Sequence, residues 1–179
     1  MKKQIFVDLD GVLVDFVVGA EAFYGKKHNH PEDWGFHYEE DWGMSPEEFW
    51  TGLDVNFWTN LPWTTDAELI LALVEPYDPV ILTAPPLSGG GLVGKVAWIR
   101  KNLPAYFKDK RYLIGSGKQY AAHPAALLID DKEENAEQFT EAGGTGILWP
   151  QPWNSNRHLI DTRIEWLQQQ LLYHLQEDY

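Results

Sequence analysis

The sequence predicts an α/β fold built on a doubly wound parallel sheet. Short apolar runs without polar alternation recur along the chain, as expected of strands that are covered on both faces. Between these runs lie segments with apolar residues at helical spacing, and strands that alternate with helices form parallel sheets with right-handed crossovers. The length of 179 residues and the hydrophobic content of 44% allow one core with a small insertion.

The apolar runs and the helical patterns give the expected elements in order. Strands are expected at residues 5–7, 80–82, 112–114, 126–129 and 146–149. Helices are expected after Asp15 and at about residues 65–75, 92–103, 133–142 and 160–175. The helix at 65–75 would open with a capping box at Thr65 (TDAE).

Residues 16–61 do not follow the alternation of strands and helices. They hold the helix expected after Asp15, a polar stretch rich in His, Asp, Glu and Trp, and a second capping box at Ser45 (SPEE) with proline at the first helical position. We interpret residues 16–61 as a small helical cap inserted after the first strand. Residues 1–15 and 62–179 would form the core domain.

Composition and charge exclude several classes of protein. The chain has 14 Lys and Arg against 27 Asp and Glu, a net charge of −13, which disfavours binding to a nucleic-acid polymer. The absence of cysteine excludes disulfides, a thiolate metal site and a cysteine nucleophile. No apolar stretch approaches the roughly 18 residues of a membrane span, so we expect no membrane partner, and the lack of cysteine fits a cytoplasmic protein.

Acidic residues and a hydroxyl follow three of the expected strands. Asp8 and Asp10 follow the first, Thr83 the second, and Asp130 and Asp131 the fourth. The carboxyl ends of parallel strands meet at the edge of the sheet where ligands bind. Clustered carboxylates repel one another, and a hard divalent cation removes that cost; oxygen ligands favour magnesium over zinc. A single acid could simply end a strand in solvent, but the whole set predicts a Mg²⁺ site.

Four motifs carry a family resemblance: DLDGVLVDF at 8–16, ILTAP at 81–85, KVAW at 95–98 and LLIDD at 127–131. In this order they resemble the haloacid dehalogenase (HAD) superfamily of phosphohydrolases, and within it the 5'(3')-deoxyribonucleotidases. The resemblance spans nearly the whole chain. It implies a Rossmann-like core with a cap and a Mg²⁺-dependent phosphomonoesterase. That enzyme would act on (deoxy)nucleoside monophosphates through an aspartyl-phosphate intermediate.

The resemblance also implies roles for the acids. Asp8 would attack phosphorus, and Asp10 would protonate the leaving alcohol and then activate water. The carboxylates of Asp8 and Asp131 and the backbone carbonyl of Asp10 would hold Mg²⁺. Asp130 and Asn135 would support these ligands without touching the metal.

Phosphate binding is expected from Thr83 and the backbone of Ala84, which stands where the nucleotidases usually have a hydroxyl residue. One lysine should neutralise charge between the nucleophile and the phosphate. Lys95 is favoured, because it lies in a stretch that resembles the nucleotidases, and Lys118, which lies nearer the strand before Asp130 and Asp131, is the alternative phosphate-binding lysine.

The cap is expected to contact the nucleoside. Phe16 matches a base-contacting position in the nucleotidase pattern, and Trp34 and Trp50 are approximate matches. An aromatic cap over a phosphate site suits base stacking, although aromatic residues also fill the core of a small cap.

Three alternative functions share the predicted fold with the nucleotidase interpretation. The same chemistry could serve a sugar phosphate, a receiver-like regulatory module could accept phosphate on an aspartate, or the fold could bind ligands without catalysis. Receivers use an aspartate after a middle strand and lack such a cap, and turnover of p-nitrophenyl phosphate would separate them from an enzyme. The expected partner is a small phosphorylated metabolite, and a homodimer is compatible with the sequence.

Overall fold

The chain folds around one parallel sheet. The computed structural model describes residues 3–28, 42–86 and 89–175, and its sheet has five strands in the order β3-β2-β1-β4-β5. All neighbouring strands pair in parallel. The strands are β1 (Gln4–Val7), β2 (Val80–Thr83), β3 (Tyr112–Ile114), β4 (Ala126–Asp130) and β5 (Thr145–Leu148). The doubly wound parallel sheet predicted from the apolar runs is confirmed.

Helices cover both faces of this sheet. They are α5 (Ala67–Val74), α6 (Gly91–Asn102), α7 (Pro104–Lys108), α8 (Glu133–Glu141) and α9 (Arg163–Leu175). Ile5 and Val7 of β1 belong to a core that includes residues of α5, α6 and α9, whereas Phe6 belongs to a second core with Phe139 of α8. Successive strand residues point to opposite faces, so each face has its own apolar cover. None of the helices in the described part of the chain has the length and apolar character needed to cross a bilayer.

Two expected helix starts are wrong. The capping box at Thr65 does not form: α5 begins at Ala67, and its N-cap Asp66 makes no side-chain capping bond. Instead, the Asp66 carboxylate accepts a hydrogen bond of 2.6 Å from Nε of Arg163. The C-terminal helix begins at Arg163 rather than at residue 160, because the preceding residues form the 3₁₀ helix η4 (Arg157–Thr162).

The described part of the chain also contains short helices that the sequence does not predict. They are α4 (Val55–Thr59), α7, and the 3₁₀ helices η2 (Glu75–Tyr77) and η3 (Lys118–Ala121). Each has five residues or fewer, which is too short for a periodic apolar pattern to be read.

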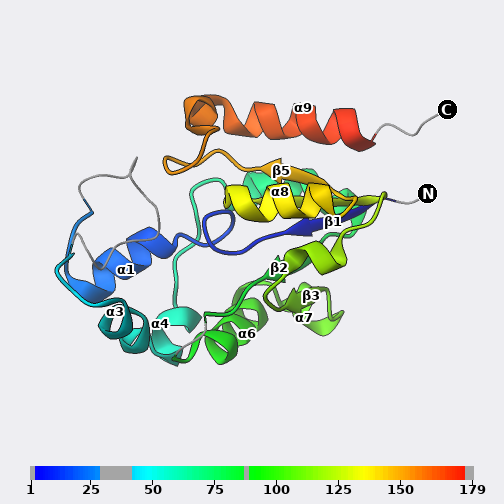
Figure 1. The fold of residues 1–179 in the computed structure, drawn as a ribbon. Coiled ribbons are helices and arrows are strands. Elements are labelled where there is room, and N and C mark those ends of the chain that lie inside the picture. Colours follow the sequence, from blue (N-terminus) through cyan, green and yellow to red (C-terminus); the bar gives the residue numbers. More distant parts are fainter. Residues whose placement is uncertain (1–2, 29–41, 87–88, 176–179) are drawn as a thin grey trace.

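The segment between β1 and α5 is helical where it is described. It contains α1 (Phe16–Tyr24), α3 (Pro46–Gly52) and α4. The capping box at Ser45 is confirmed, with both reciprocal hydrogen bonds present. Figure 1 shows these three helices together at the end of the molecule away from both termini, beyond the carboxyl ends of the strands, and α4 packs against α6 of the core.

Both ends of this helical segment leave the core at one place. The backbone N–H of Asp15 donates to the carbonyl of Pro62, and that of Thr64 donates to the carbonyl of Leu13, each at 2.9 Å. Val14 and Trp63 form an antiparallel bridge between the two connections. The connections therefore lie side by side, directly after the residues that follow β1.

Candidate active site

The nucleophile candidate lies at the carboxyl end of the central strand. Asp8 is 6% exposed, and its N–H donates to the carbonyl of Ile129 at 3.0 Å, which extends the pairing of β1 with β4. Gly11 turns the chain after the aspartate pair with a φ of +72°, and a Cβ there would lie 2.2 Å from Oδ2 of Asp131. The glycine in the DLDG motif is therefore needed both for its backbone angle and for the close approach of an acidic side chain.

Lys118 lies between two of the carboxylates. Its Nζ is 2.8 Å from Oδ1 of Asp8 and 2.5 Å from Oδ2 of Asp130, and its side chain is 3% exposed. Burial alone would lower the pKa of the Lys118 ammonium, but the carboxylates of Asp8 and Asp130 raise it above its usual range. The raised pKa favours a positively charged Lys118 beside Asp8, the nucleophile candidate. Gly117, with a φ of +87°, allows the turn that begins η3 at this lysine.

Lys95 lies on the other side of the aspartate pair. Its Nζ donates to Oγ1 of Thr83 at 2.9 Å, to the carbonyl of Ala84 at 2.6 Å and to the carboxylate of Asp10. Desolvation in the site raises the pKa of Asp10, Lys95 lowers it, and Asp8 raises it again, so the net pKa is above its ordinary value. A carboxyl group with a raised pKa is suited to give a proton to a leaving group. The structure therefore brings both candidate lysines into the site, each with a different partner.

The acids after β4 have different surroundings. The two oxygens of Asp130 accept hydrogen bonds from Lys118, from the N–H of Lys132 and from Nδ2 of Asn135. Oδ2 of Asp131 accepts a hydrogen bond of 2.9 Å from Nε1 of Trp153. Burial, followed by repulsion from Asp130 and Asp8, raises the pKa of Asp131 well above its ordinary value. The ionised form of Asp131 therefore lacks sufficient compensating charge within the protein itself.

The net charge of this acidic cluster suits a divalent cation. Oxygens of Asp8, Asp130 and Asp131 all lie within 4.8 Å of one another. The site holds four carboxylates, three of them buried, and two buried ammonium groups, so its formal charge is 2 − 4 = −2 when all six groups are ionised. A dication would balance that charge, and the donor set is made only of oxygens. The residues present therefore fit a hard metal ion such as Mg²⁺.

The loop that follows β5 also belongs to the site, although the sequence does not mark it as functional. Nε2 of Gln151 donates to the carbonyl of Gly11, and Nδ2 of Asn154 donates to the carbonyl of Asp131 at 2.9 Å. Trp153 bonds the carboxylate of the same aspartate. The signal that could have found these residues is their place after a strand that ends at the same edge of the sheet. Their neutral side chains do not stand out among charged candidates.

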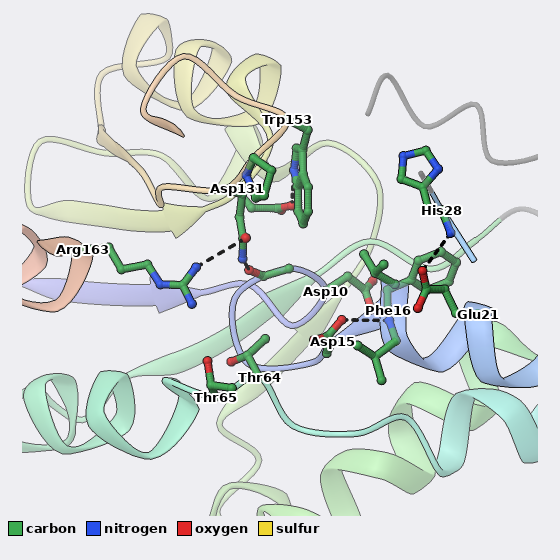
Figure 2. Close-up of a pocket in the computed structure, with 15 residues that line it drawn as sticks. Asp10, Asp15, Phe16, Glu21, His28, Thr64, Thr65, Asp131, Trp153 and Arg163 are labelled. Carbon is green, nitrogen blue, oxygen red and sulfur yellow. Dashed lines mark hydrogen bonds between the residues drawn. The ribbon is translucent and has the colours of Figure 1, made fainter. Parts of the chain in front are cut away.

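A cavity of about 260 Å³ lies beside Asp10 and Asp131. Figure 2 shows Trp153 and Arg163 on one side of it and the first turns of α1, with Phe16 and Glu21, on the other. Asp15, at the N-terminus of α1, also lines this cavity, and burial raises its pKa. The cavity therefore lies between Asp10 and Asp131 of the core and the helical segment.

Two of the three aromatic residues expected to bind substrate, Phe16 and Trp50, belong to a packed cluster. Phe16 is 7% exposed and stacks with Trp50 and Trp58 at centroid distances of 5.8 and 5.4 Å. The rings of Phe49 and Phe57 pack edge-on against it. Phe16 is therefore part of the hydrophobic core and also lines the cavity. Trp50 is half-buried, and Trp34 lies outside the described residues.

Comparison with known proteins gives a family and a fold. The family model described as "5' nucleotidase, deoxy (Pyrimidine), cytosolic type C protein" matches residues 2–175. No protein of curated function matches the sequence. A HAD family hydrolase from Deinococcus radiodurans R1, solved with phosphate and sodium, has a TM-score of 0.60 at 17% identity over 96% of either chain. A hydrolase from Streptococcus pneumoniae TIGR4 has a TM-score of 0.50 at 15% identity, over 90% of this chain and 100% of its own. At such identities these two structures establish the shared fold.

Proposed function

The chain belongs to the family of cytosolic type C 5'-deoxynucleotidases and is a phosphoric monoester hydrolase, and we propose that it dephosphorylates (deoxy)nucleoside monophosphates with the help of Mg²⁺. The observation that supports metal binding is the formal charge of −2, which four carboxylates and two ammonium groups give at the strand ends. The family description supports a nucleotide as the substrate.

In the proposed first step, a carboxylate oxygen of Asp8 attacks phosphorus while the bond to the leaving oxygen breaks. Asp10 gives its proton to that oxygen, and the alcohol departs. Water then attacks the aspartyl phosphate, Asp10 takes a proton from it, and the phosphorus–Asp8 bond breaks to release inorganic phosphate. The raised pKa of Asp10 supports its role as the acid of the first step.

The metal would be held by the carboxylates of Asp8 and Asp131 and the backbone carbonyl of Asp10. When bound, Mg²⁺ shields the negative charge between the nucleophile and the phosphate. Asp130 and Asn135 would act from outside the ligand set, because both oxygens of Asp130 already accept hydrogen bonds from protein groups.

Two lysines would divide the role that the sequence predicts for one. Lys118 lies against Asp8 and would offset the charge of the nucleophile. Lys95 would hold Asp10 and the hydroxyl of Thr83 in place. Thr83 and the N–H of Ala84 would then bind the phosphate oxygens.

Residues 16–61 would act as a cap that selects the substrate, above a core made of residues 1–15 and 62–179. Stacking of a base on an aromatic side chain is worth roughly 1–3 kcal/mol. Phe16 lines the cavity, and Trp50, the more exposed of the two rings, stacks on Phe16, so both are candidates for contact with the base. The family description also names a cytosolic type, which supports a cytoplasmic location.

The test is a comparison of substrates in the presence of Mg²⁺. We expect kcat/KM for dUMP and dTMP to exceed that for ribose 5-phosphate by about five- to 150-fold. The Asp8→Asn protein, purified in the same way, serves as the control for contaminating phosphatases. Equal values for the nucleotides and the sugar phosphate would remove the nucleotidase proposal and leave a phosphatase of sugar phosphates. A single stoichiometric phosphorylation without turnover of any substrate would contradict both.

A further inference from the structure

One loop holds Asp131 at both its backbone and its side chain. Nδ2 of Asn154, which is 5% exposed, donates to the backbone carbonyl of Asp131 at 2.9 Å. Nε1 of Trp153 donates to Oδ2 of the same residue at 2.9 Å. Figure 2 shows the indole of Trp153 beside the Asp131 carboxylate, with the dashed line that marks this bond.

The bond from Trp153 leaves the two oxygens of Asp131 unequal. Oδ2 is confined between the indole N–H and the α-carbon of Gly11, where a Cβ would come within 2.2 Å of it. Within the described residues, no hydrogen bond is made to Oδ1 of Asp131. The indole N–H therefore occupies one acceptor position on Oδ2 and leaves Oδ1 of Asp131 available to a ligand.

The loop that carries Trp153 is anchored independently of any ligand. Gln151 donates to the carbonyl of Gly11, and Asn154 donates to the carbonyl of Trp149 at 2.8 Å. Arg163 reaches the carbonyl of Pro150 at 3.4 Å. Trp153 is therefore presented by a framework that is tied to the turn after β1 as well as to β5.

We propose that Trp153 is a positioning residue, whose indole N–H holds Oδ2 of Asp131 so that Oδ1 faces the divalent cation. This inference rests on the proposed role of Asp131 as a Mg²⁺ ligand. A neutral donor suits this role, because the indole fixes direction with one N–H, whereas a lysine in its place would cancel part of the charge of −2 that attracts the metal. Partners of metal ligands typically change metal affinity by about 10- to 100-fold when they are removed.

The experiment compares Trp153→Phe with Trp166→Phe. Trp166 is a half-buried tryptophan of α9 that packs on the same hydrophobic core, so it controls for the loss of an indole. Mg²⁺ affinity is measured by calorimetry on chelator-treated protein without substrate, and kcat is measured at saturating Mg²⁺. We expect the Kd for Mg²⁺ to rise about 10- to 100-fold in Trp153→Phe, with most of kcat recovered at saturation, and to stay within about twofold in Trp166→Phe.

A third variant separates the hydrogen bond from packing. Trp153→His keeps a ring N–H in a side chain smaller than tryptophan, as phenylalanine is, and measurement at pH 9 keeps the imidazole neutral despite the nearby carboxylates. We expect Trp153→His to bind Mg²⁺ more tightly than Trp153→Phe. Equal weakening in both variants, or an unchanged Kd in Trp153→Phe, would overturn the inference while the metal proposal stands. A wild-type protein that binds no Mg²⁺ would overturn both.

Discussion

The two regions that meet at the candidate site are held together by different forces. At the strand ends, charged side chains are paired by directional contacts: Lys118 with Asp8 and Asp130, and Lys95 with Asp10 and Thr83. In the helical segment 16–61, aromatic rings pack against one another around Phe16. The first arrangement fixes the positions of charged atoms, whereas the second is a buried apolar cluster.

This difference predicts how each region responds to change. Removing one charged partner from the strand ends should cost reaction rate, because the geometry of the reacting groups depends on it. Removing a ring from the helical segment should cost stability and selectivity, because packing there is shared among many neighbours. We expect effects that range from a loss of turnover to a small change in stability.

Asp8→Asn should lower kcat by roughly 10⁴-fold or more, because an amide is not a competent nucleophile and no neighbouring group replaces it. The measurement is phosphate release from dUMP in Mg²⁺. Circular dichroism provides the control for folding. Near-normal turnover by a folded Asp8→Asn protein would show that the proposed covalent mechanism is wrong.

Metal removal should abolish turnover in the wild-type protein. After exhaustive treatment with EDTA, the uncompensated charge of −2 would repel a phosphate dianion. Mg²⁺ should restore activity, whereas Ca²⁺, with its larger and looser coordination shell, should not. Undiminished turnover after chelation would contradict the metal assignment and leave the fold and family untouched.

Phe16→Ala should lower the free energy of unfolding by about 3–5 kcal/mol, the range for buried phenylalanines. Phe16 has ring neighbours in α3 and α4, so the cavity left by its removal would affect the whole helical segment. Chemical denaturation measures the effect, with Phe23→Ala as the matched control, since Phe23 of α1 is 46% exposed. Equal, small losses in both variants would show that Phe16 does not hold the segment together.

Asp15→Asn should stabilise the protein slightly at pH 7.5 and leave it unchanged near pH 3. Burial raises the pKa of Asp15 in the folded state, so its contribution to stability is full below the unfolded pKa and is lost as pH rises through the folded pKa. Asparagine keeps the acceptor for the N–H of Val18 without the buried charge. Melting temperatures across this pH range measure the difference, and a destabilised variant at pH 7.5 would contradict the sign.

The sequence predicts the sheet well because its strands are buried on both faces. All five residues of β4 are buried, so its apolar run needs no long-range information to be read as a strand. The predicted start of α5 is wrong because it depends on a long-range contact. Asp66 takes its partner from Arg163, which is 97 residues away, and no local pattern contains that contact. The HAD fold and the nucleotidase family expected from the motifs are confirmed by the family match and the similar structures.

The candidate site could be predicted where its residues are charged and follow strands. Which lysine lies against Asp8 depends on how α6 and the loop before η3 pack, and the sequence alone does not contain that information. Trp153 and Asn154 were missed because neutral side chains in a loop carry no chemical signal until Asp131 is seen between them. The packing of Phe16 depends on three helices meeting in space, which the spacing of aromatic residues did not reveal.

The contrast between the two regions is tested most directly by measuring kcat/KM for dUMP and ribose 5-phosphate in three proteins. Both substrates release a primary alcohol, so loss of the acid should affect them equally. We predict that Asp10→Asn lowers both values by about 10²- to 10⁴-fold and keeps their ratio. Trp50→Ala should bring the ratio toward one while sparing ribose 5-phosphate. A changed ratio in Asp10→Asn, or an equal loss for both substrates in Trp50→Ala, would contradict the division of chemistry and selectivity between core and cap.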